Sequence, residues 1–224
     1  MLQPKPKILF ATTNDHKIRL FKIAWLDKKL DQKFELVTLD DIPKIDLGYI
    51  NEDSGSFTGD ATLKAGQYAK AYNLPTISQD RGFVFLALNW PGTDSKKVFT
   101  LDETHEFKVG KWSETKDLYF ERSKEVLAKI DGLDRKMQVI QGLCLAMPNG
   151  ELIAQEFVLN GRANSKCKES VSGAGGMYDW FFVPDGLDHT ISEFKTKKEQ
   201  DNYVALKMYP ITNKIVDFLY SKVA

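Results

Sequence analysis

The N-terminal part of the chain alternates between strand-like apolar runs and a helical stripe. Residues 8–12 form an apolar run that ends in polar residues, which predicts a buried strand. Residues 15–26 carry apolar side chains at helical spacing, so we expect a helix there. Residues 34–39 predict a second strand. Such a mixture of strands and helices is typical of α/β proteins.

A second helix is predicted after a polar, turn-rich stretch. One apolar stripe runs from Ala61 to Tyr72 and ends at Asn73 and Pro75, which both favour a helix end. Thr58 or Gly59 is the expected N-cap, because short polar residues and glycine are preferred at that position. Pattern and end signals therefore agree on a helix in this region.

Two short strands are predicted next, at residues 76–78 and 84–88, on either side of a turn at residues 79–82. Gly82 permits a tight turn, so Asp80 is expected where the first of these strands ends. Ligands of open α/β sheets usually bind at such strand ends. A carboxylate that only caps the turn is the alternative interpretation of Asp80.

The rest of the chain continues the mixture of elements. The pattern predicts a helix at 118–130, a hairpin of strands 137–147 and 152–160, an aromatic strand at 180–184, and a C-terminal helix from about 199 to 220 that Pro210 should break or kink. No repeat, low-complexity block or linker divides the chain. We therefore predict an α/β fold class and a single domain over residues 1–224, with residues 100–160 contributing largely to a second lobe.

Composition excludes several classes of protein. Lys plus Arg and Asp plus Glu both number 31, so the basic excess typical of nucleic-acid-binding proteins is absent. The two cysteines, Cys144 and Cys167, lack the spacing of a zinc site or of a disulfide framework. No apolar run is long enough to span a membrane. These features predict a soluble, cytoplasmic protein with no nucleic-acid or membrane partner.

The turn at residues 12–17 is the first candidate site. Thr12, Thr13 and Asn14 follow the first strand, and Lys17 lies on the first turn of the next helix. Backbone N–H groups, the helix dipole and an ammonium group would all point at the same place, which favours anion binding. A solvated surface lysine is the alternative. No P-loop sequence occurs, so any phosphate site is of another kind.

Acidic residues from separated segments suggest a metal site. Glu52 or Asp53 together with Asp80 would suit Mg²⁺, which takes a few carboxylate oxygens and bridges to substrate phosphates. Lys64 lies beside the apolar stripe of the second helix, where it either serves this site or pairs with Asp60 one turn earlier. The G-x-S-x-G motif of serine hydrolases is absent, so metal-assisted chemistry is favoured over covalent catalysis.

Four separated blocks resemble the Ham1-type inosine triphosphate pyrophosphatases, in that family's order. The family's T-G-N-x-x-K resembles T-T-N-D-H-K at residues 12–17, and its acidic block E-T-G…F-x-x-N-A-x-x-K-A resembles residues 53–65. Its D-D-S-G-L, A-L and P-G resemble residues 79–92. Its F-G-Y-D-P-I-F-x-P resembles residues 177–184, one residue shorter, and its A-E-L falls at residues 192–194. The resemblance spans most of the chain.

The resemblance implies an elongated, two-lobed mixed-sheet fold with a central nucleotide cleft, usually as a homodimer. It also implies Mg²⁺-dependent hydrolysis of non-canonical purine nucleoside triphosphates, such as ITP and XTP, to a monophosphate and pyrophosphate. By the same resemblance, Lys17 and Lys64 hold phosphates, Asp53 and Asp80 bind Mg²⁺, and Asp80 also orients or deprotonates the attacking water.

Further residues of the substrate site follow from the same resemblance. Tyr178 and Asp179 would border the base, Arg81 could reach a phosphate or pair with a carboxylate, and Lys198 is a further candidate for substrate binding.

The chain departs from the family pattern at several of these positions. The family's K-x-x-x-S-H-R, which helps to read the purine, corresponds to a shorter stretch at residues 197–206 without S-H-R. Gln79 and Arg81 replace an acidic and a small residue, Asp60 stands where asparagine is usual, and Asp53 is shorter than the usual glutamate. The phosphate and metal half of the site is thus largely retained, whereas base recognition is altered.

Two alternatives to the triphosphate pyrophosphatase hypothesis stay open at this point. The chain could be a nucleotide-binding protein of the same fold that has lost catalysis, as the missing S-H-R and the residues Gln79 and Arg81 would suggest. It could also be a phosphohydrolase that acts on a different modified nucleotide.

Overall fold

The computed structural model describes residues 4–48, 50, 53–95, 97–100, 112–171, 177–208 and 210–223. The chain forms two compact units. The first unit comprises Met1–Asp80, Gln141–Phe157 and Ala205–Ala224, and the second comprises Arg81–Ile140 and Val158–Val204. Within the stretch 100–160, residues 100–140 and 158–160 belong to the second unit, whereas residues 141–157 belong to the first.

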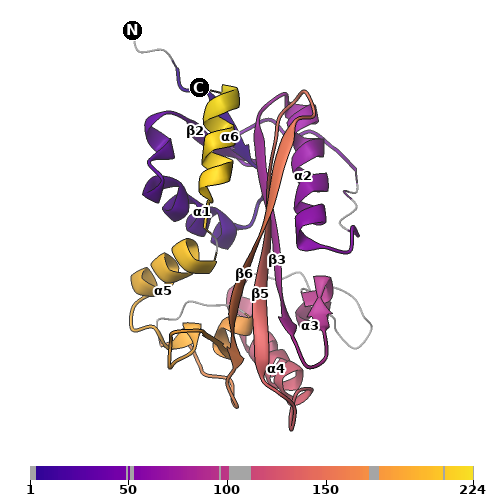
Figure 1. The fold of residues 1–224 in the computed structure, drawn as a ribbon, viewed down its shortest axis with the longest axis vertical. Helices are drawn as coiled ribbons and strands as arrows, with labels where there is room; N and C mark the ends of the chain where they lie inside the picture. The colour runs from indigo at the N-terminus through magenta and orange to yellow at the C-terminus, as the bar shows by residue number, and fades with distance from the viewer. Residues whose placement is uncertain are drawn as a thin grey trace. The chain divides into compact units, whose positions relative to one another are not determined.

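The first unit holds the N-terminal elements and the C-terminal helix (Figure 1). Its elements are β1 (Lys7–Phe10), α1 (Asp15–Asp27), a 3₁₀ turn (Leu30–Gln32), β2 (Glu35–Thr38), α2 (Phe57–Tyr72) and α6 (Asn213–Val223). Three longer strands contribute residues to both units, namely β3 (Thr76–Phe85), β5 (Lys136–Ala146) and β6 (Leu152–Ala163).

The second unit holds one long helix, α4, and several shorter elements. They are β4 (Trp90–Gly92), α3 (Lys97–Thr100), α4 (Trp112–Ala128), β7 (Phe182–Pro184), α5 (Lys197–Tyr203) and the 3₁₀ turns Thr93–Ser95, Met177–Trp180 and Ile191–Glu193. A single turn of π-helix, Val204–Met208, follows α5. The predicted break of the C-terminal helix is confirmed, because α5 and α6 are separate helices on either side of Pro210.

The strands pair in the order β2-β1-β3-β5-β6-β7, and β4 pairs with β3. The β1–β2 and β1–β3 pairs are parallel, whereas β3–β4 and β6–β7 are antiparallel. Parallel neighbours need a crossover connection, and the predicted helices α1 and α2 supply it. The predicted α/β fold class is confirmed in this mixed sheet.

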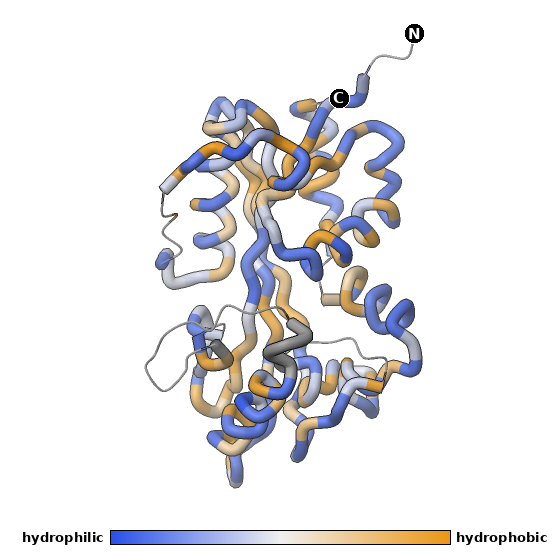
Figure 2. The backbone as a smooth tube through the Cα atoms, turned by 180° about the vertical axis from the view of Figure 1, so that it is seen from behind, coloured by the Kyte–Doolittle hydropathy of each residue, from blue (hydrophilic) through white to orange (hydrophobic). Residues whose placement is uncertain are grey.

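The sheet of the first unit is covered on both faces (Figure 1). Ile77 of β3 and Leu143 and Leu145 of β5 pack against side chains of α1 and α6. Because successive strand residues point to opposite faces, Cys144 and Ala146 face the other way, where they pack against a stripe of alanines on α2. Figure 2 shows hydrophobic and hydrophilic segments alternating along these helices, as expected for helices with one buried side.

Gly142 lets α2 approach the sheet closely. A Cβ atom at Gly142 would lie 2.3 Å from the backbone carbonyl of Phe57 and from the backbone nitrogen of Thr58, at the start of α2. Glycine lacks this atom, so the first turn of the helix can rest directly on β5. The position of α2, and of every side chain that it carries, therefore depends on this residue.

Two local predictions are wrong. Residues 79–82 do not form a turn, because β3 runs without a break from Thr76 to Phe85, and residues beyond Gly82 pair with β4. The aromatic and branched residues Phe83–Phe85 are fully or almost fully buried, and that burial favours strand over turn. The N-cap of α2 is Ser56 rather than Thr58 or Gly59, since the Ser56 side chain accepts the N–H of Gly59 at 3.0 Å.

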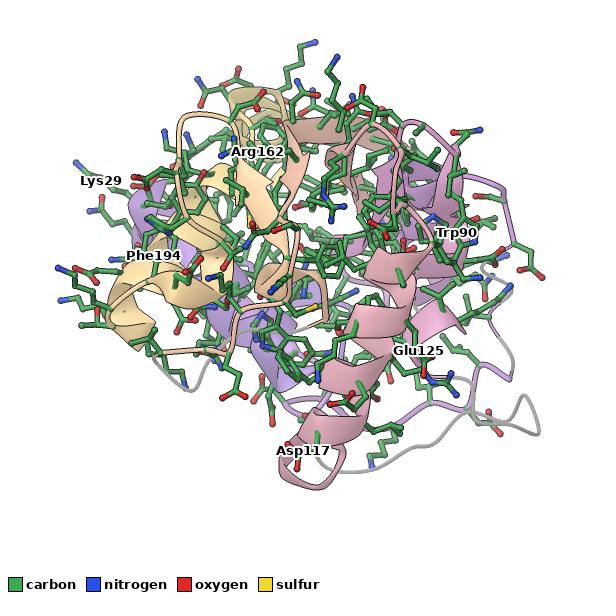
Figure 3. All side chains as sticks on the ribbon, turned by 90° about the horizontal axis from the view of Figure 1, so that it is seen from below. Lys29, Trp90, Asp117, Glu125, Arg162 and Phe194 are labelled. Atoms are coloured by element: carbon green, nitrogen blue, oxygen red, sulfur yellow. The ribbon has the colours of Figure 1, made fainter. Side chains whose placement is uncertain are left out.

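The second unit has an aromatic core around Phe83. This side chain contacts the rings of Phe85, Phe99, Tyr178 and Phe181, with ring centroids 5.3 to 5.8 Å apart. Helix α4 joins this core through Phe120, whose ring meets Trp180 edge to face at 5.1 Å. The exposed carboxylates of Asp117 and Glu125 lie on the outer surface of α4 (Figure 3).

Candidate functional site

The start of α1 has the geometry that the sequence predicts. Asn14 caps the helix, because its side-chain oxygen accepts the backbone N–H of Lys17 at 3.1 Å. The Thr12 hydroxyl accepts the N–H of Asn14 at 3.2 Å, which fixes the turn between β1 and α1. Thr13 is exposed beside them. Lys17 consequently leaves the first helical turn from a well-defined backbone, at the positive end of the helix dipole.

Lys17 and Asp80 lie next to each other. The Lys17 Nζ atom is 3.9 Å from Asp80 Oδ1, and it also donates to the backbone carbonyl of Gln79 at 3.4 Å. Only 17% of the Lys17 side chain and 24% of the Asp80 side chain are exposed. Lys17 and Asp80, which are far apart in the sequence, therefore lie side by side in a partly buried position.

The different lengths of β1 and β3 explain why Lys17 and Asp80 lie close together. The pairing of β1 with β3 ends at Phe10 and Ile77, but β3 continues for several more residues. Beyond Ile77 the edge of β3 is no longer covered by β1, so Lys17 can reach the carbonyl of Gln79. Asp80 thus lies beside the carboxyl end of β1, where ligands of α/β sheets usually bind. It is an internal residue of β3 rather than part of a turn.

Strand alternation separates Asp80 from its two neighbours. Ile77 belongs to the core on the α1 side, so regular alternation along the strand predicts Gln79 and Arg81 on that face, and Ser78 and Asp80 on the face that α2 covers. Gln79 is buried, with 5% of its surface exposed, whereas Asp80 and Arg81 are both half-buried. Alternation therefore predicts that the two residues that depart from the family pattern lie on the opposite face of the strand from Asp80.

Asp53 lies in the segment that leads into α2, and this segment is anchored to the helix. Asp60 is only 3% exposed and accepts the backbone N–H of Ser54 at 2.9 Å. The Ser54 hydroxyl donates to the carbonyl of Ser56, the N-cap of α2. Asp53 is exposed directly before this anchor. The interpretation of Asp60 as a surface partner of Lys64 is wrong, because Asp60 is buried.

Lys64 is half-buried on α2, one position before the buried Ala65. The alanine stripe of α2 packs on Cys144 and Ala146 of β5. Lys64 is thus carried by the helix that covers this face of the sheet, and Asp53 by the segment that leads into that helix. Glu52, the alternative acidic candidate, lies outside the described residues.

The other predicted substrate residues belong to the second unit. Tyr178 and Asp179 are buried in the 3₁₀ turn Met177–Trp180, where the Tyr178 ring packs against Phe83 at 5.5 Å. Arg81 is half-buried in β3, and Lys198 is exposed on α5. The contact between Lys17 and Asp80 therefore joins a residue predicted to hold phosphate to one predicted to bind metal.

The donor set around Asp80 fits a metal ion shared with a substrate. Within the described parts of the chain, no three His, Cys, Asp or Glu side chains gather closely enough to form a metal cage. Mg²⁺ does not need such a cage, since it is commonly held by one or two carboxylates, several waters and substrate phosphates. The accessible carboxylate of Asp80 fits this kind of site, and Asp53 is an exposed carboxylate in the segment before α2.

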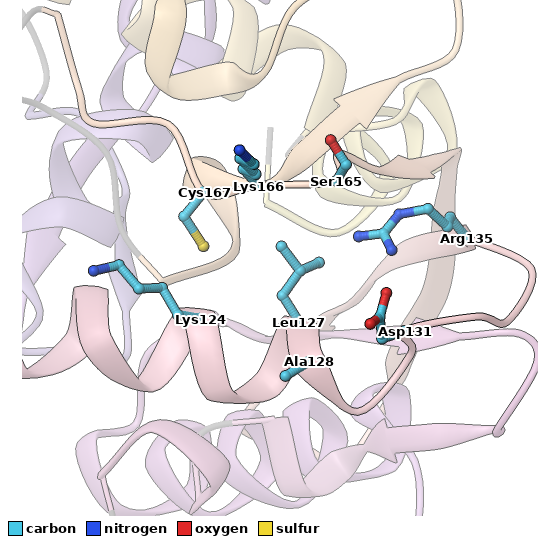
Figure 4. A pocket seen from close by; sticks show the side chains of 8 residues that line it. All are labelled: Lys124, Leu127, Ala128, Asp131, Arg135, Ser165, Lys166 and Cys167. Atoms are coloured by element: carbon cyan, nitrogen blue, oxygen red, sulfur yellow. The ribbon is translucent and has the colours of Figure 1, made fainter.

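A separate pocket of about 420 Å³ lies in the second unit (Figure 4). Its lining residues are Lys124, Leu127, Ala128, Asp131, Arg135, Ser165, Lys166 and Cys167. Its basic groups are largely engaged, because Lys124 pairs with Glu121 at 2.7 Å and Arg135 donates to the carbonyls of Ala163 and Asn164. Burial raises the pKa of the Cys167 thiol to about 11, so this thiol is neutral near pH 7. None of the predicted site residues lines this pocket.

Sequence reasoning missed two residues that shape the site. Gly142 sets the distance between α2 and β5, and a lone glycine within a strand pattern is the signal that could have identified it. The backbone carbonyl of Gln79 holds Lys17, but a main-chain acceptor carries no signature in the sequence.

Known proteins resemble most of this chain in sequence and in fold. A dITP/XTP pyrophosphatase from Gluconobacter oxydans is 29% identical over 195 residues, which covers 86% of this chain and 82% of the relative. The crystal structure of a nucleoside-triphosphatase and dITP/XTP pyrophosphatase from Mycobacterium abscessus is 26% identical, with a TM-score of 0.62, and covers 87% of this chain and 91% of that one. The structure of the Staphylococcus aureus Ham1 protein, 22% identical, shares the fold with a TM-score of 0.70 over 96% of this chain and 99% of its own.

The sequence profile of the Ham1 family matches residues 8–203, which include the two helices that carry Lys17 and Lys64 and the strand that carries Asp80. This match spans most of the chain, and it agrees with the structural similarity and with the motifs at the start of α1 and in β3. The protein is a member of the Ham1 family.

Proposed function

We propose that the protein hydrolyses nucleoside triphosphates to a nucleoside monophosphate and pyrophosphate. The observation that carries this proposal is the meeting of Lys17, at a helix start, with Asp80, on the neighbouring strand. A cation suited to phosphate and a carboxylate suited to a metal ion then act on the same polyphosphate. The names of the relatives, dITP/XTP pyrophosphatases, support the same reaction.

Each residue has a distinct role in the proposed reaction. Lys17 and Lys64 hold phosphate oxygens, together with the backbone at residues 12–14 at the start of α1. Asp80 orients a water molecule for attack on the α-phosphorus and accepts its proton. Pyrophosphate leaves as the bond between the α-phosphorus and the bridging oxygen breaks, and the new oxygen remains on the monophosphate. Preorganised charge supplies most of the acceleration in such reactions.

We also propose that the enzyme uses Mg²⁺, held by Asp53 and Asp80. A bound divalent ion would polarise the phosphate oxygens and offset their charge. A homodimer, a cytoplasmic location and contacts of Tyr178, Asp179, Arg81 and Lys198 with the nucleotide belong to the same proposal.

The catalytically inactive alternative is less well supported. Strand alternation from Ile77 predicts its motivating residues, Gln79 and Arg81, on the opposite face of β3 from Asp80. A carboxylate at position 79 would lie on the buried side of β3, so its replacement by glutamine removes no ligand from the accessible side. The altered stretch at 197–206 concerns the base, so we propose a changed base preference rather than a lost reaction.

A nucleotide panel tests the proposal. Purified protein is incubated with ITP, dITP, XTP, dUTP and the four ordinary triphosphates, in Mg²⁺ and separately in excess chelator, and both products are measured. We expect equal amounts of monophosphate and pyrophosphate from at least one substrate, only when Mg²⁺ is present. Release of inorganic phosphate, or no turnover by folded protein, would contradict the proposed reaction.

A further inference from the structure

The Lys17–Asp80 pair joins the residue proposed to hold phosphate to the residue proposed to hold metal. In the protein without ligands, these two opposite charges lie 3.9 Å apart. We propose that this ion pair makes the binding of metal and of polyphosphate interdependent, because each ligand offsets the charge that repels the other. This inference rests on the proposed function only for the identity of the two ligands.

Each charge of the Lys17–Asp80 pair opposes the binding of one of the two ligands. A cation that approaches Asp80 meets the ammonium group of Lys17, and a polyphosphate that approaches Lys17 meets the carboxylate of Asp80. Both side chains are more than three-quarters buried, so water and salt screen the pair less than they screen a surface ion pair. Thermodynamic linkage requires the effect to be reciprocal: if metal improves polyphosphate binding, polyphosphate improves metal binding by the same factor.

A second contact, with the main chain of β3, holds the Lys17 side chain beside Asp80. The Lys17 ammonium group also donates to the Gln79 carbonyl, a neutral main-chain acceptor on β3 beyond its pairing with β1. When a metal ion takes the Asp80 carboxylate, Lys17 retains this contact and its charge is no longer offset by Asp80. The ammonium group of Lys17 then attracts a phosphate more strongly. Metal binding therefore makes this place more favourable for an anion.

Binding measurements without turnover test this inference. Wild type, Lys17→Met, Asp80→Asn and the double variant are titrated by calorimetry with two separate probes, Mn²⁺ alone and inorganic tripolyphosphate in excess chelator. Lys17→Met should bind Mn²⁺ roughly two- to tenfold more tightly than wild type, as expected for loss of one partly buried ion pair. Asp80→Asn should bind metal-free tripolyphosphate tighter by a similar factor, although it removes the proposed metal ligand.

The double variant separates the ion pair from a general change of charge. If the gain from Asp80→Asn comes from releasing Lys17, it should vanish when Lys17 is already methionine. If the gain in affinity came only from the change in net charge, it would persist in the Lys17→Met variant. Lys22→Met, an exposed lysine on the same helix, is the matched control and should change neither affinity. Thermal melts establish that each variant is folded, and Lys17→Gln and Asp80→Ser replace any variant that is not.

Two results would overturn the inference: no gain in either single variant, or a gain from Asp80→Asn that persists without Lys17. These outcomes differ from failure of the proposed function. An active enzyme without the coupling would refute the ion-pair inference alone, and a coupled but inactive protein would refute the proposed reaction alone.

Discussion

Substitution of Gly142 by alanine tests how closely the fold controls the site. The added Cβ would lie 2.3 Å from backbone atoms at the start of α2, whereas ordinary contacts begin at 3.4 Å, so the helix start must move by about 1.1 Å. The obstructing atoms belong to the main chain and cannot rotate away. The buried stripe of Ala61, Ala65 and Ala69 would then separate from β5 and lose packing.

The size of the effect follows from this displacement. Overpacking of a well-packed interior typically costs about 1–3 kcal/mol. In a chain of this length, that corresponds to a fall in Tm of roughly 3 to 10 °C. Because α2 carries Lys64 and anchors the segment of Asp53, a shift of about 1 Å should also lower kcat by up to roughly a hundredfold.

Gly66→Ala is the matched control on the same helix. A Cβ at Gly66 meets nothing within 4 Å, so this change should stabilise α2 by about 0.5–1 kcal/mol, through helix propensity alone. Thermal unfolding followed by circular dichroism and a pyrophosphate-release assay measure both variants. If Gly142→Ala melts no lower than wild type and keeps full turnover, the close approach of α2 to β5 does not determine the positions of Lys64 and Asp53.

Three further changes test other parts of the account. Asp80→Asn should lower turnover by at least roughly a hundredfold while the protein stays folded, because it removes the proposed proton acceptor; full activity would exclude that role. Ser56→Ala should cost about 1 kcal/mol of unfolding free energy, because it removes the cap of α2, and Thr58→Ala should cost less in the same melt if Ser56 is the cap. Burial raises the pKa of the Cys144 thiol from 9.0 to about 11, so the unfolded chain loses this proton first and stability should fall as pH rises from 9.0 to about 11. Denaturant melts across this range should show a shallower fall in Cys144→Ala; an identical pH dependence would contradict the assigned burial effect.

Local signals in the sequence predicted the elements that carry the site. The helix after residues 12–14 and the position of Lys17 follow from a short apolar run, a polar turn and helical spacing. The break at Pro210 follows from the missing N–H of proline. Such features depend on a few neighbouring residues, so they can be read without knowledge of the rest of the chain.

Tertiary contacts decided the features that the sequence did not predict. Asp80, Arg81 and Gly82 are typical of a turn, but pairing with β4 and burial of Phe83 extend the strand through them. Several small polar residues precede α2, and the docking of its first turn on Gly142 involves a strand far along the chain. The opposite faces of Gln79 and Asp80 also become clear only when the strand is continuous. The functional meaning of the departures from the family pattern therefore depended on the structure.

The central claim is that water attacks the α-phosphorus of a nucleoside triphosphate beside Lys17 and Asp80. Its most direct test is hydrolysis of the best substrate in heavy-oxygen water, with mass spectrometry of both products. The account predicts one heavy oxygen in the nucleoside monophosphate and none in the pyrophosphate. Heavy oxygen in pyrophosphate or in inorganic phosphate would contradict it, because the attack would then occur at another phosphorus atom.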